Sequence, residues 1–260
     1  MDFRQNGHQE VLRYKKIRVR VRRQDSAESL SYWEEYEIPY GAGHNVLSVL
    51  MEIRKNPVDI EGKRVSPIVW ESNCLEEVCG ACSMVINGRA QQACTALVDK
   101  LEAPITIEPM DKFPVIRDLA VDRSRMFENL KTVKAWIDLD GTYALGAGPR
   151  QDPEEALTRY RLSTCMSCGV CLQVCPQVAQ DNDFVGVAII NQVRLFNSHP
   201  VGKFKANERL DAVMGEGGVA DCGNAQNCVE ACPKNIPLTE SIAEVGRQAT
   251  VRALRKWAGI

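Results

Sequence analysis

Cysteine is the residue type in this sequence with the greatest capacity for chemistry. The chain has 260 residues and 11 cysteines, which fall into three groups separated by long stretches without cysteine. Disulfides are disfavoured in a reducing cytoplasm, where clustered thiols are more readily explained as metal ligands or redox groups. An odd count also leaves disulfide pairing incomplete. The sequence therefore predicts a metal-binding or redox protein.

The first group has the spacing of a two-iron site. It opens with C-x4-C-x2-C, the plant-type ferredoxin spacing, in which thiolates hold a [2Fe-2S] cluster. Gly80 and Ala81 lie between two ligands, where small side chains let backbone N–H groups approach the cluster sulfurs. A structural zinc site is the alternative, although zinc sites generally use paired C-x2-C knuckles. The predicted ligands are Cys74, Cys79, Cys82 and Cys94.

The second and third groups have the spacing of a two-cluster bacterial ferredoxin. The second runs C-x2-C-x2-C-x3-C-P, a pattern whose first three cysteines bind one cubane and whose fourth binds the other cluster. In the third group the same spacing requires a cysteine at position 225, which is Ala225. A four-iron cluster with a non-cysteine ligand is the alternative. We predict a [4Fe-4S] cluster on Cys165, Cys168, Cys171 and Cys232, and a [3Fe-4S] cluster on Cys175, Cys222 and Cys228.

Other chemistry is not indicated. The histidines, His8, His44 and His199, show no pairing and no proximity to cysteine, which disfavours Rieske ligation and an internal haem site. Neither a G-x-G-x-x-G or Walker sequence nor a nucleophile constellation is present. We therefore predict no catalytic residue in this chain.

Strands and one helix are expected around the first group. Residues 17–22 alternate apolar and charged side chains, as a half-buried strand does, and residues 33–39 and 68–70 are predicted as further strands. Asn45 caps a predicted helix that ends at Asn56-Pro57.

Asn87-Gly88 is the strongest short hairpin signal in the chain, because a type I′ turn needs positive φ at both central residues. With that turn Cys82 faces Ala93, which brings Cys94 within one residue of Cys82. The hairpin would therefore gather two ligands.

The remainder of the chain is predicted to be helical. Residues 122–136 form a helix in this interpretation, residues 141–153 a Gly- and Pro-rich connection, and residues 238–257 an amphipathic helix whose cations form a solvated face. The fold class is α+β, with an N-terminal domain over residues 1–118 and an α-helical domain over residues 119–260.

Charge and hydropathy limit the classes of partner that are expected for this chain. Lys+Arg 32 nearly balances Asp+Glu 34, for a formal charge of −2, so nucleic acid is not an expected partner. No segment approaches the roughly 20 apolar residues needed to span a bilayer. The polar stretch from Met1 to Lys16 lacks the apolar core of a signal peptide, which favours a cytoplasmic chain. Membrane association is expected only through a partner.

A [2Fe-2S] domain followed by a two-cluster domain with one missing cysteine resembles the iron-sulfur subunits of succinate dehydrogenases and fumarate reductases. The resemblance spans residues 17–240 and includes the segments Asn73–Gly88, Phe113–Leu119 and Cys232–Pro237. It implies a β-grasp domain and then an α-helical ferredoxin domain.

The resemblance also implies partners and a role. In the family this subunit sits between a flavoprotein with covalently bound FAD, where succinate and fumarate interconvert, and a membrane anchor. Electrons pass through the [2Fe-2S], [4Fe-4S] and [3Fe-4S] clusters to quinone. The chain would serve the tricarboxylic acid cycle and respiratory chain at the cytoplasmic face of the cell membrane.

One departure points to a branch of the family. Ubiquinone-reducing members carry tryptophan shortly after the Cys-Pro of the second group and histidine after the first cysteine of the third. Here these places hold Gln177–Gln180 and Gly223. The pattern, with Glu76-Glu77 and Gly215–Gly218, resembles the Gram-positive branch, which implies menaquinone and a di-haem cytochrome b anchor.

Four alternatives stay open at this point. The chain could work in fumarate reduction, or serve another flavoprotein complex, although such subunits usually lack the [2Fe-2S] domain. It could be a free-standing ferredoxin shuttle or a zinc-binding interaction module. Cluster potentials depend on their surroundings, so spacing does not choose the direction of electron flow.

Overall fold

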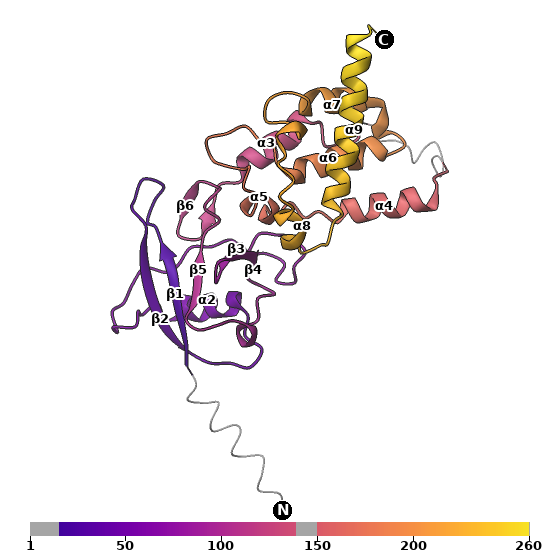
Figure 1. Ribbon diagram of the computed structural model, residues 1–260. Helices are drawn as coiled ribbons and strands as arrows, with labels where there is room; N and C mark the ends of the chain where they lie inside the picture. The colour runs from indigo at the N-terminus through magenta and orange to yellow at the C-terminus, as the bar shows by residue number, and fades with distance from the viewer. Residues whose placement is uncertain (1–15, 139–149, 260) are drawn as a thin grey trace, which may run out of the picture. The chain divides into compact units, whose positions relative to one another are not determined.

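The computed structural model describes residues 16–138 and 150–259 (Figure 1). The chain divides into two compact units after Asp122. Most of the polar N-terminus and most of the predicted Gly- and Pro-rich connection lie outside the described residues.

The first unit is built on a mixed five-stranded sheet. Its strand order is β2-β1-β5-β3-β4. β1 pairs antiparallel with β2 and parallel with β5, and β3 pairs antiparallel with β4 and with β5. With α2, this arrangement is the β-grasp fold that the resemblance implied. The strands are β1 (Lys16–Arg23), β2 (Tyr32–Pro39), β3 (Ser83–Ile86), β4 (Arg89–Gln92) and β5 (Ile105–Glu108).

Alternation along β1 and helical periodicity in α2 (Val46–Lys55) supply the core of this unit. The apolar residues of β1 are buried and most of its cations are exposed or half-buried, as the period of a half-buried strand requires. Five apolar side chains of α2 are buried in the same core. Asn45 caps this helix, because its side chain accepts a hydrogen bond from the Ser48 N–H (2.8 Å). The predicted strands at 17–22 and 33–39 and the predicted cap are confirmed.

A buried arginine fixes the end of β1. The Arg23 side chain is fully buried, and its Nε donates to Asp118 Oδ1 (2.8 Å) while Nη1 donates to the Tyr36 hydroxyl (2.9 Å). Nη2 donates to the Ser66 carbonyl (3.1 Å). Burial alone lowers the pKa of Arg23, but the hydrogen bond to Asp118 and the neighbouring charges outweigh it and raise that pKa. The arginine is therefore charged whenever the unit is folded.

Asp118 also connects the segment around Val69 to the end of β1. Its carboxylate accepts hydrogen bonds from the Gln24 N–H (3.2 Å) and the Val69 N–H (2.9 Å), and the Val69 carbonyl accepts from the Leu119 N–H (3.1 Å). The predicted strand at 68–70 is wrong: these residues belong to no strand. The Asp118 carboxylate, in place of a neighbouring strand, accepts the hydrogen bond from the Val69 N–H. Asp118 lies in the turn between β6 (Val115–Arg117) and β7 (Ala120–Val121), which pair antiparallel.

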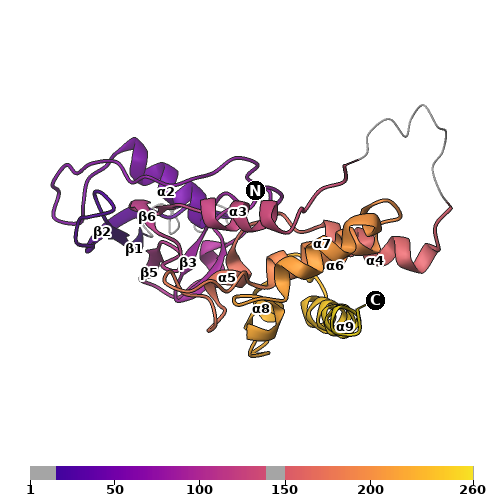
Figure 2. The same ribbon diagram turned by 90° about the horizontal axis from the view of Figure 1, so that it is seen from above.

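The second unit is helical (Figure 2). α6 packs against α4, α7 and α9, and most of its residues are buried. α9 spans the residues predicted for it. In the described ranges no helix is long and apolar enough to cross a membrane. The helices are α3 (Ser124–Thr132), α4 (Pro153–Ser163), α5 (Val170–Gln173), α6 (Val187–Ser198), α7 (Ala206–Val213), α8 (Asn227–Ala231) and α9 (Leu238–Trp257).

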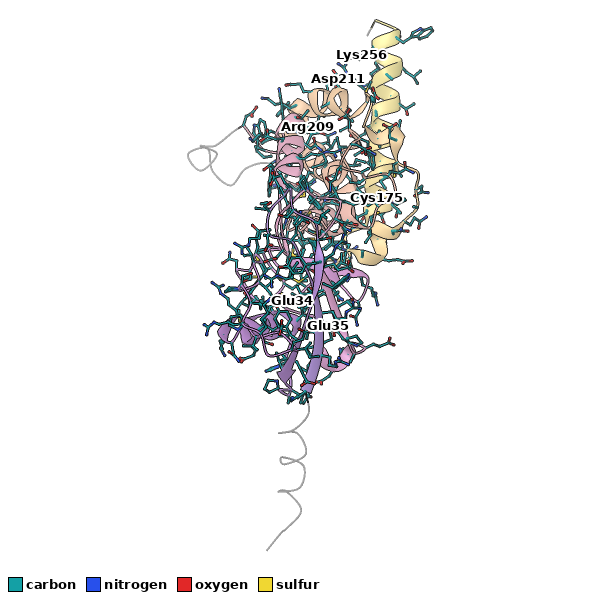
Figure 3. The ribbon with its side chains drawn as sticks, turned by 90° about the vertical axis from the view of Figure 1, so that its left-hand side faces the viewer. Glu34, Glu35, Cys175, Arg209, Asp211 and Lys256 are labelled. Carbon is teal, nitrogen blue, oxygen red and sulfur yellow. The ribbon has the colours of Figure 1, made fainter. Side chains whose placement is uncertain are left out.

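Two charged side chains, Arg209 and Asp211, connect segments of this unit that are far apart in the sequence. α3 is shorter than the predicted helix at 122–136, because Lys134 has positive φ and Arg209 donates hydrogen bonds to main-chain carbonyls after the end of α3. Arg209 Nε donates to the Lys134 carbonyl (3.0 Å) and Nη2 to the Trp136 carbonyl (3.1 Å). Asp211 on α7 binds Lys256 near the end of α9 (3.3 Å), and Figure 3 shows the two side by side.

We expect Asp118→Ala to lower the free energy of unfolding by about 3–5 kcal/mol, because it removes the fully buried carboxylate paired with Arg23 and leaves Glu34 as the remaining partner. It also removes the acceptor of the Gln24 and Val69 N–H groups. Urea denaturation followed by circular dichroism measures the change. Glu37→Ala is the matched control: it removes the carboxylate of an exposed pair with Lys16, and should cost less than about 1 kcal/mol. Equal effects of the two substitutions would contradict the role of this network.

Candidate metal centres

Three residues in the left-handed region coil the loop that carries Cys74 and Cys79. They are Leu75 (φ 66°), Glu77 (φ 58°) and Gly80 (φ 71°). The coil aims backbone amides at sulfur: the Cys79 N–H donates to Cys74 Sγ (3.2 Å). Such amides favour a negatively charged sulfur. The Glu76, Val78 and Cys79 amides lower the pKa of the Cys74 thiol to about 7.

The small residues between Cys79 and Cys82 let a main-chain N–H group reach a cysteine sulfur, and its approach to cluster sulfurs stays a prediction. The Ala81 N–H donates to Cys79 Sγ (3.4 Å), and the Cys74 N–H donates to the same sulfur (3.5 Å). Gly80 supplies the positive φ that turns the chain at this point. Each of the two leading thiols is therefore met by main-chain donors.

The Asn87-Gly88 hairpin brings the other two thiols together, as predicted. Asn87 (φ 46°) and Gly88 (φ 75°) form the turn between β3 and β4, and the Ala93 N–H donates to the Cys82 carbonyl (3.0 Å). Cys94 is close enough to Cys82 for a hydrogen bond between their thiols. Burial, followed by that neighbouring thiol, raises the pKa of Cys94 to about 12.

Two contacts that sequence reasoning missed support Cys94. Asn45, predicted only as a helix cap, also donates from Nδ2 to the Cys94 carbonyl (2.8 Å). The Thr95 hydroxyl donates to Glu77 Oε1 (2.9 Å), which fastens the Cys94 segment to the Cys74 loop. Neither contact has a local pattern, because each joins residues far apart in the chain.

One cavity of the second unit groups three cysteines of the second group with one of the third. It encloses about 400 Å³, including its open mouth. Burial raises the pKa of Cys165, raises that of Cys168 to about 11 and raises that of Cys171 well above its usual range. A bound cation favours the thiolate form of such buried groups. The lining cysteines are Cys165, Cys168, Cys171 and Cys232.

A second cavity groups the remaining three cysteines. It encloses about 390 Å³ with its mouth, and Ala225 lines it where a fourth thiol would be required. Burial also raises the pKa of Cys228. Cys175 comes from the second group and the others from the third, so each cavity draws on both groups. The lining cysteines are Cys175, Cys222 and Cys228.

The described histidines lie outside these sites. His199 Nδ1 accepts hydrogen bonds from the Val201 and Gly202 N–H groups (3.2 Å each), and burial lowers its pKa. Across residues 16–138 and 150–259, no three His, Cys, Asp or Glu side chains converge closely enough to hold a single metal ion. The thiols surround cavities or a coiled loop instead. That sulfur-rich arrangement fits polynuclear iron-sulfur clusters.

Comparison with known proteins agrees with this geometry. A family described as a 2Fe-2S iron-sulfur cluster binding domain matches residues 18–128, and one described as a 4Fe-4S dicluster domain matches residues 161–236. The succinate dehydrogenase iron-sulfur subunit of Bacillus subtilis is 58% identical over 94% of this chain and 97% of its own. The fumarate reductase iron-sulfur subunit of Wolinella succinogenes is 30% identical over 89% and 96%.

The fold also has a solved counterpart. A chain of the Mycobacterium smegmatis Sdh1 complex in the apo form matches with a TM-score of 0.72 at 22% identity, and the match covers 91% of this chain and 96% of that one.

We expect Gly88→Val to weaken the [2Fe-2S] signal before those of the other clusters. A β-branched residue at positive φ costs about 1–2 kcal/mol, and no other atom lies within 4 Å of an added Cβ, so the strain is confined to the backbone. Gly88→Asn is the control, since asparagine tolerates this region. Electron paramagnetic resonance measures each cluster. Parallel loss of all three signals, or of none, would refute the role of the hairpin.

Proposed function

Because this chain belongs to the family of succinate dehydrogenase and fumarate reductase iron-sulfur subunits, we propose that it transfers electrons between a flavoprotein and a membrane anchor. It is one subunit of an oxidoreductase complex that other subunits complete. The chain contributes cluster-binding domains. The observation that carries the proposal is the sorting of seven thiols into two cavities, four in one and three in the other.

That sorting and the coiled loop support the proposed ligand sets. A [2Fe-2S] cluster belongs to the domain over residues 1–118, and two further clusters belong to residues 119–260. Bound clusters take up and release single electrons, because their charge is spread over several atoms. The ligands are Cys74, Cys79, Cys82 and Cys94 for [2Fe-2S], Cys165, Cys168, Cys171 and Cys232 for [4Fe-4S], and Cys175, Cys222 and Cys228 for [3Fe-4S].

Residues of this chain donate hydrogen bonds to the sulfur ligands, fix their positions and limit their contact with water. The amides of the Cys74 loop donate to sulfur, and the hairpin and Asn45 position Cys82 and Cys94. In the second unit, Cys168 and Cys228 are buried and the other five cysteines are partly buried, which limits the access of water to the sulfur ligands. Fixed surroundings let a site change charge with little rearrangement.

The partners are a flavoprotein with covalent FAD and an anchor that is a di-haem cytochrome b, reached at the cytoplasmic face of the cell membrane. Menaquinone is the acceptor. The residue types at Gln177–Gln180 and Gly223 support this branch, since the tryptophan and histidine of ubiquinone-reducing members are absent from these positions. Succinate oxidation is favoured over fumarate reduction by the 58% identity to a succinate dehydrogenase subunit.

We expect the isolated, cluster-loaded chain to be inactive towards succinate with an artificial acceptor, because it has no substrate-binding chemistry. Adding the flavoprotein should restore dye-linked succinate oxidation, and quinone reduction should also require the membrane subunit. Spectrophotometric assays of the three combinations test this. Appreciable succinate oxidation by this chain alone would show that the proposed function is wrong.

We expect wild-type protein to give an isotropic-looking resonance near g of about 2, typical of an oxidised three-iron cluster. Ala225→Cys should convert this site to [4Fe-4S], because it places a thiolate at the vacant corner. The potential of the site should then fall, and each ~60 mV makes electron uptake about tenfold less favourable. Redox titration and quinone assays measure this, while dye-linked succinate oxidation should be unchanged.

Ala225→Ser is the matched control, since it has nearly the volume of the cysteine variant without a thiolate. The three-iron signal should persist in it. Absence of that signal from anaerobically prepared wild-type protein would contradict the three-ligand assignment.

A further inference from the structure

Arg125 makes an unusual set of contacts at the start of α3. Its Nη1 donates to the Ala179 carbonyl (2.7 Å), and its Nη2 donates to the carbonyls of Phe184 (3.2 Å) and Asn182. All three of these acceptors are backbone carbonyls of one segment. A guanidinium offers five N–H donors in a rigid fork, so one side chain can hold several carbonyls at fixed positions.

The segment that Arg125 holds, residues 177–185, follows the cysteine that closes the second group. It has no regular secondary structure and joins Cys175 to α6. Gln177 and Phe184, at or next to its two ends, line the same cavity as Cys175. Asn182 braces it from within: Nδ2 donates to the Gln177 carbonyl (2.7 Å) and Oδ1 accepts from the Ala179 N–H (3.3 Å). The segment is thus one wall of the three-thiol cavity.

The same segment also supports the approach to Cys222. The Val185 N–H donates to the Gly217 carbonyl (2.9 Å), and a Cβ on Gly217 would clash with the Asp183 carbonyl. The Gly217 N–H donates in turn to Asp221 Oδ2 (2.6 Å), next to Cys222. Contacts therefore run from Arg125 through the segment to residues beside two of the three cysteines.

We propose that Arg125 is a positioning residue for the three-iron site and acts by clamping residues 177–185 through its fork of hydrogen bonds. The inference rests on the proposed function, because it takes Cys175, Cys222 and Cys228 as the cluster ligands. Without the fork, three carbonyls lose their donors and the cavity wall opens to solvent. Lysine at this position keeps the charge, but its compact ammonium does not match three carbonyls at once.

The test compares Arg125→Gln and Arg125→Lys in the assembled complex. Lys131→Gln is the matched control: it removes a cation from the same helix, where Lys131 is exposed and paired with Glu128. An iron chelator is added, and the decay of the three-iron and [2Fe-2S] resonances is followed. Loss of groups that hold metal ligands in place typically costs about 10- to 100-fold in metal affinity. Both Arg125 variants should therefore lose the three-iron signal about tenfold faster, with [2Fe-2S] decay unchanged.

Decay at the wild-type rate in both variants would overturn the clamp. A normal rate in Arg125→Lys alone would also overturn it, because charge would then suffice without the fork. If the Arg125→Gln variant fails to assemble, the Asn182→Ala variant tests the proposal instead. It removes the hydrogen bonds of Asn182 within residues 177–185 and should accelerate loss of the three-iron signal but not of the [2Fe-2S] signal, and an unchanged rate would overturn the clamp. Failure of the ligand assignment is distinguishable, because wild-type protein would then lack the three-iron signal before any chelator is added.

Discussion

Holding negatively charged sulfur in places from which most water has been removed is the constraint on which the rest of this structure depends. Burial raises the pKa of Cys94 to about 12 and that of Cys168 to about 11, so these thiols favour the protonated form near neutral pH. Iron ligands must be deprotonated, and metal binding therefore displaces protons and contributes to folding stability. Cys74 differs, because main-chain amides lower its pKa to about 7.

The two units meet this constraint with different supports. In the first, regular elements do most of the positioning: the β3–β4 hairpin sets Cys82 against Cys94, and the Asn45 cap of α2 reaches the Cys94 carbonyl. In the second, only Cys171 in α5 and Cys228 in α8 lie in helices, and irregular segments between the helices have carbonyls that need donors. Long cationic side chains supply them, as Arg125 does for residues 179–184 and Arg209 does after α3. These hydrogen bonds are partly buried. A carbonyl that is removed from water without a donor is costly, which explains the use of guanidinium groups there.

Spacing and periodicity predicted the parts of the structure that depend on neighbouring residues. The hairpin, the Asn45 cap and α9 follow from local rules, and the structure confirms them. The strand at 68–70 failed because Asp118, about fifty residues away, replaces a ladder with its carboxylate. Contacts of this kind, like that of Arg125, join distant residues and leave no periodic pattern. Cysteine spacing could be used to predict ligand sets because the coordination geometry of a cluster, rather than the fold, limits that spacing. The assignment of each thiolate to its cluster stays a prediction.

The surroundings of the two cavities differ in a way that bears on which of them meets a redox partner. The four-thiol cavity is lined by buried residues such as Ala188, Ile236 and Leu238. The rim of the three-thiol cavity is exposed, and residues 223–227 carry amide or small side chains without a formal charge. Covering an uncharged amide costs far less than covering a carboxylate or an ammonium, provided that hydrogen bonds are replaced. Residues 223–227 can therefore be buried against another surface without stranding a charge of their own, and the carboxylate of the neighbouring Asp221 accepts a hydrogen bond from the Gly217 N–H.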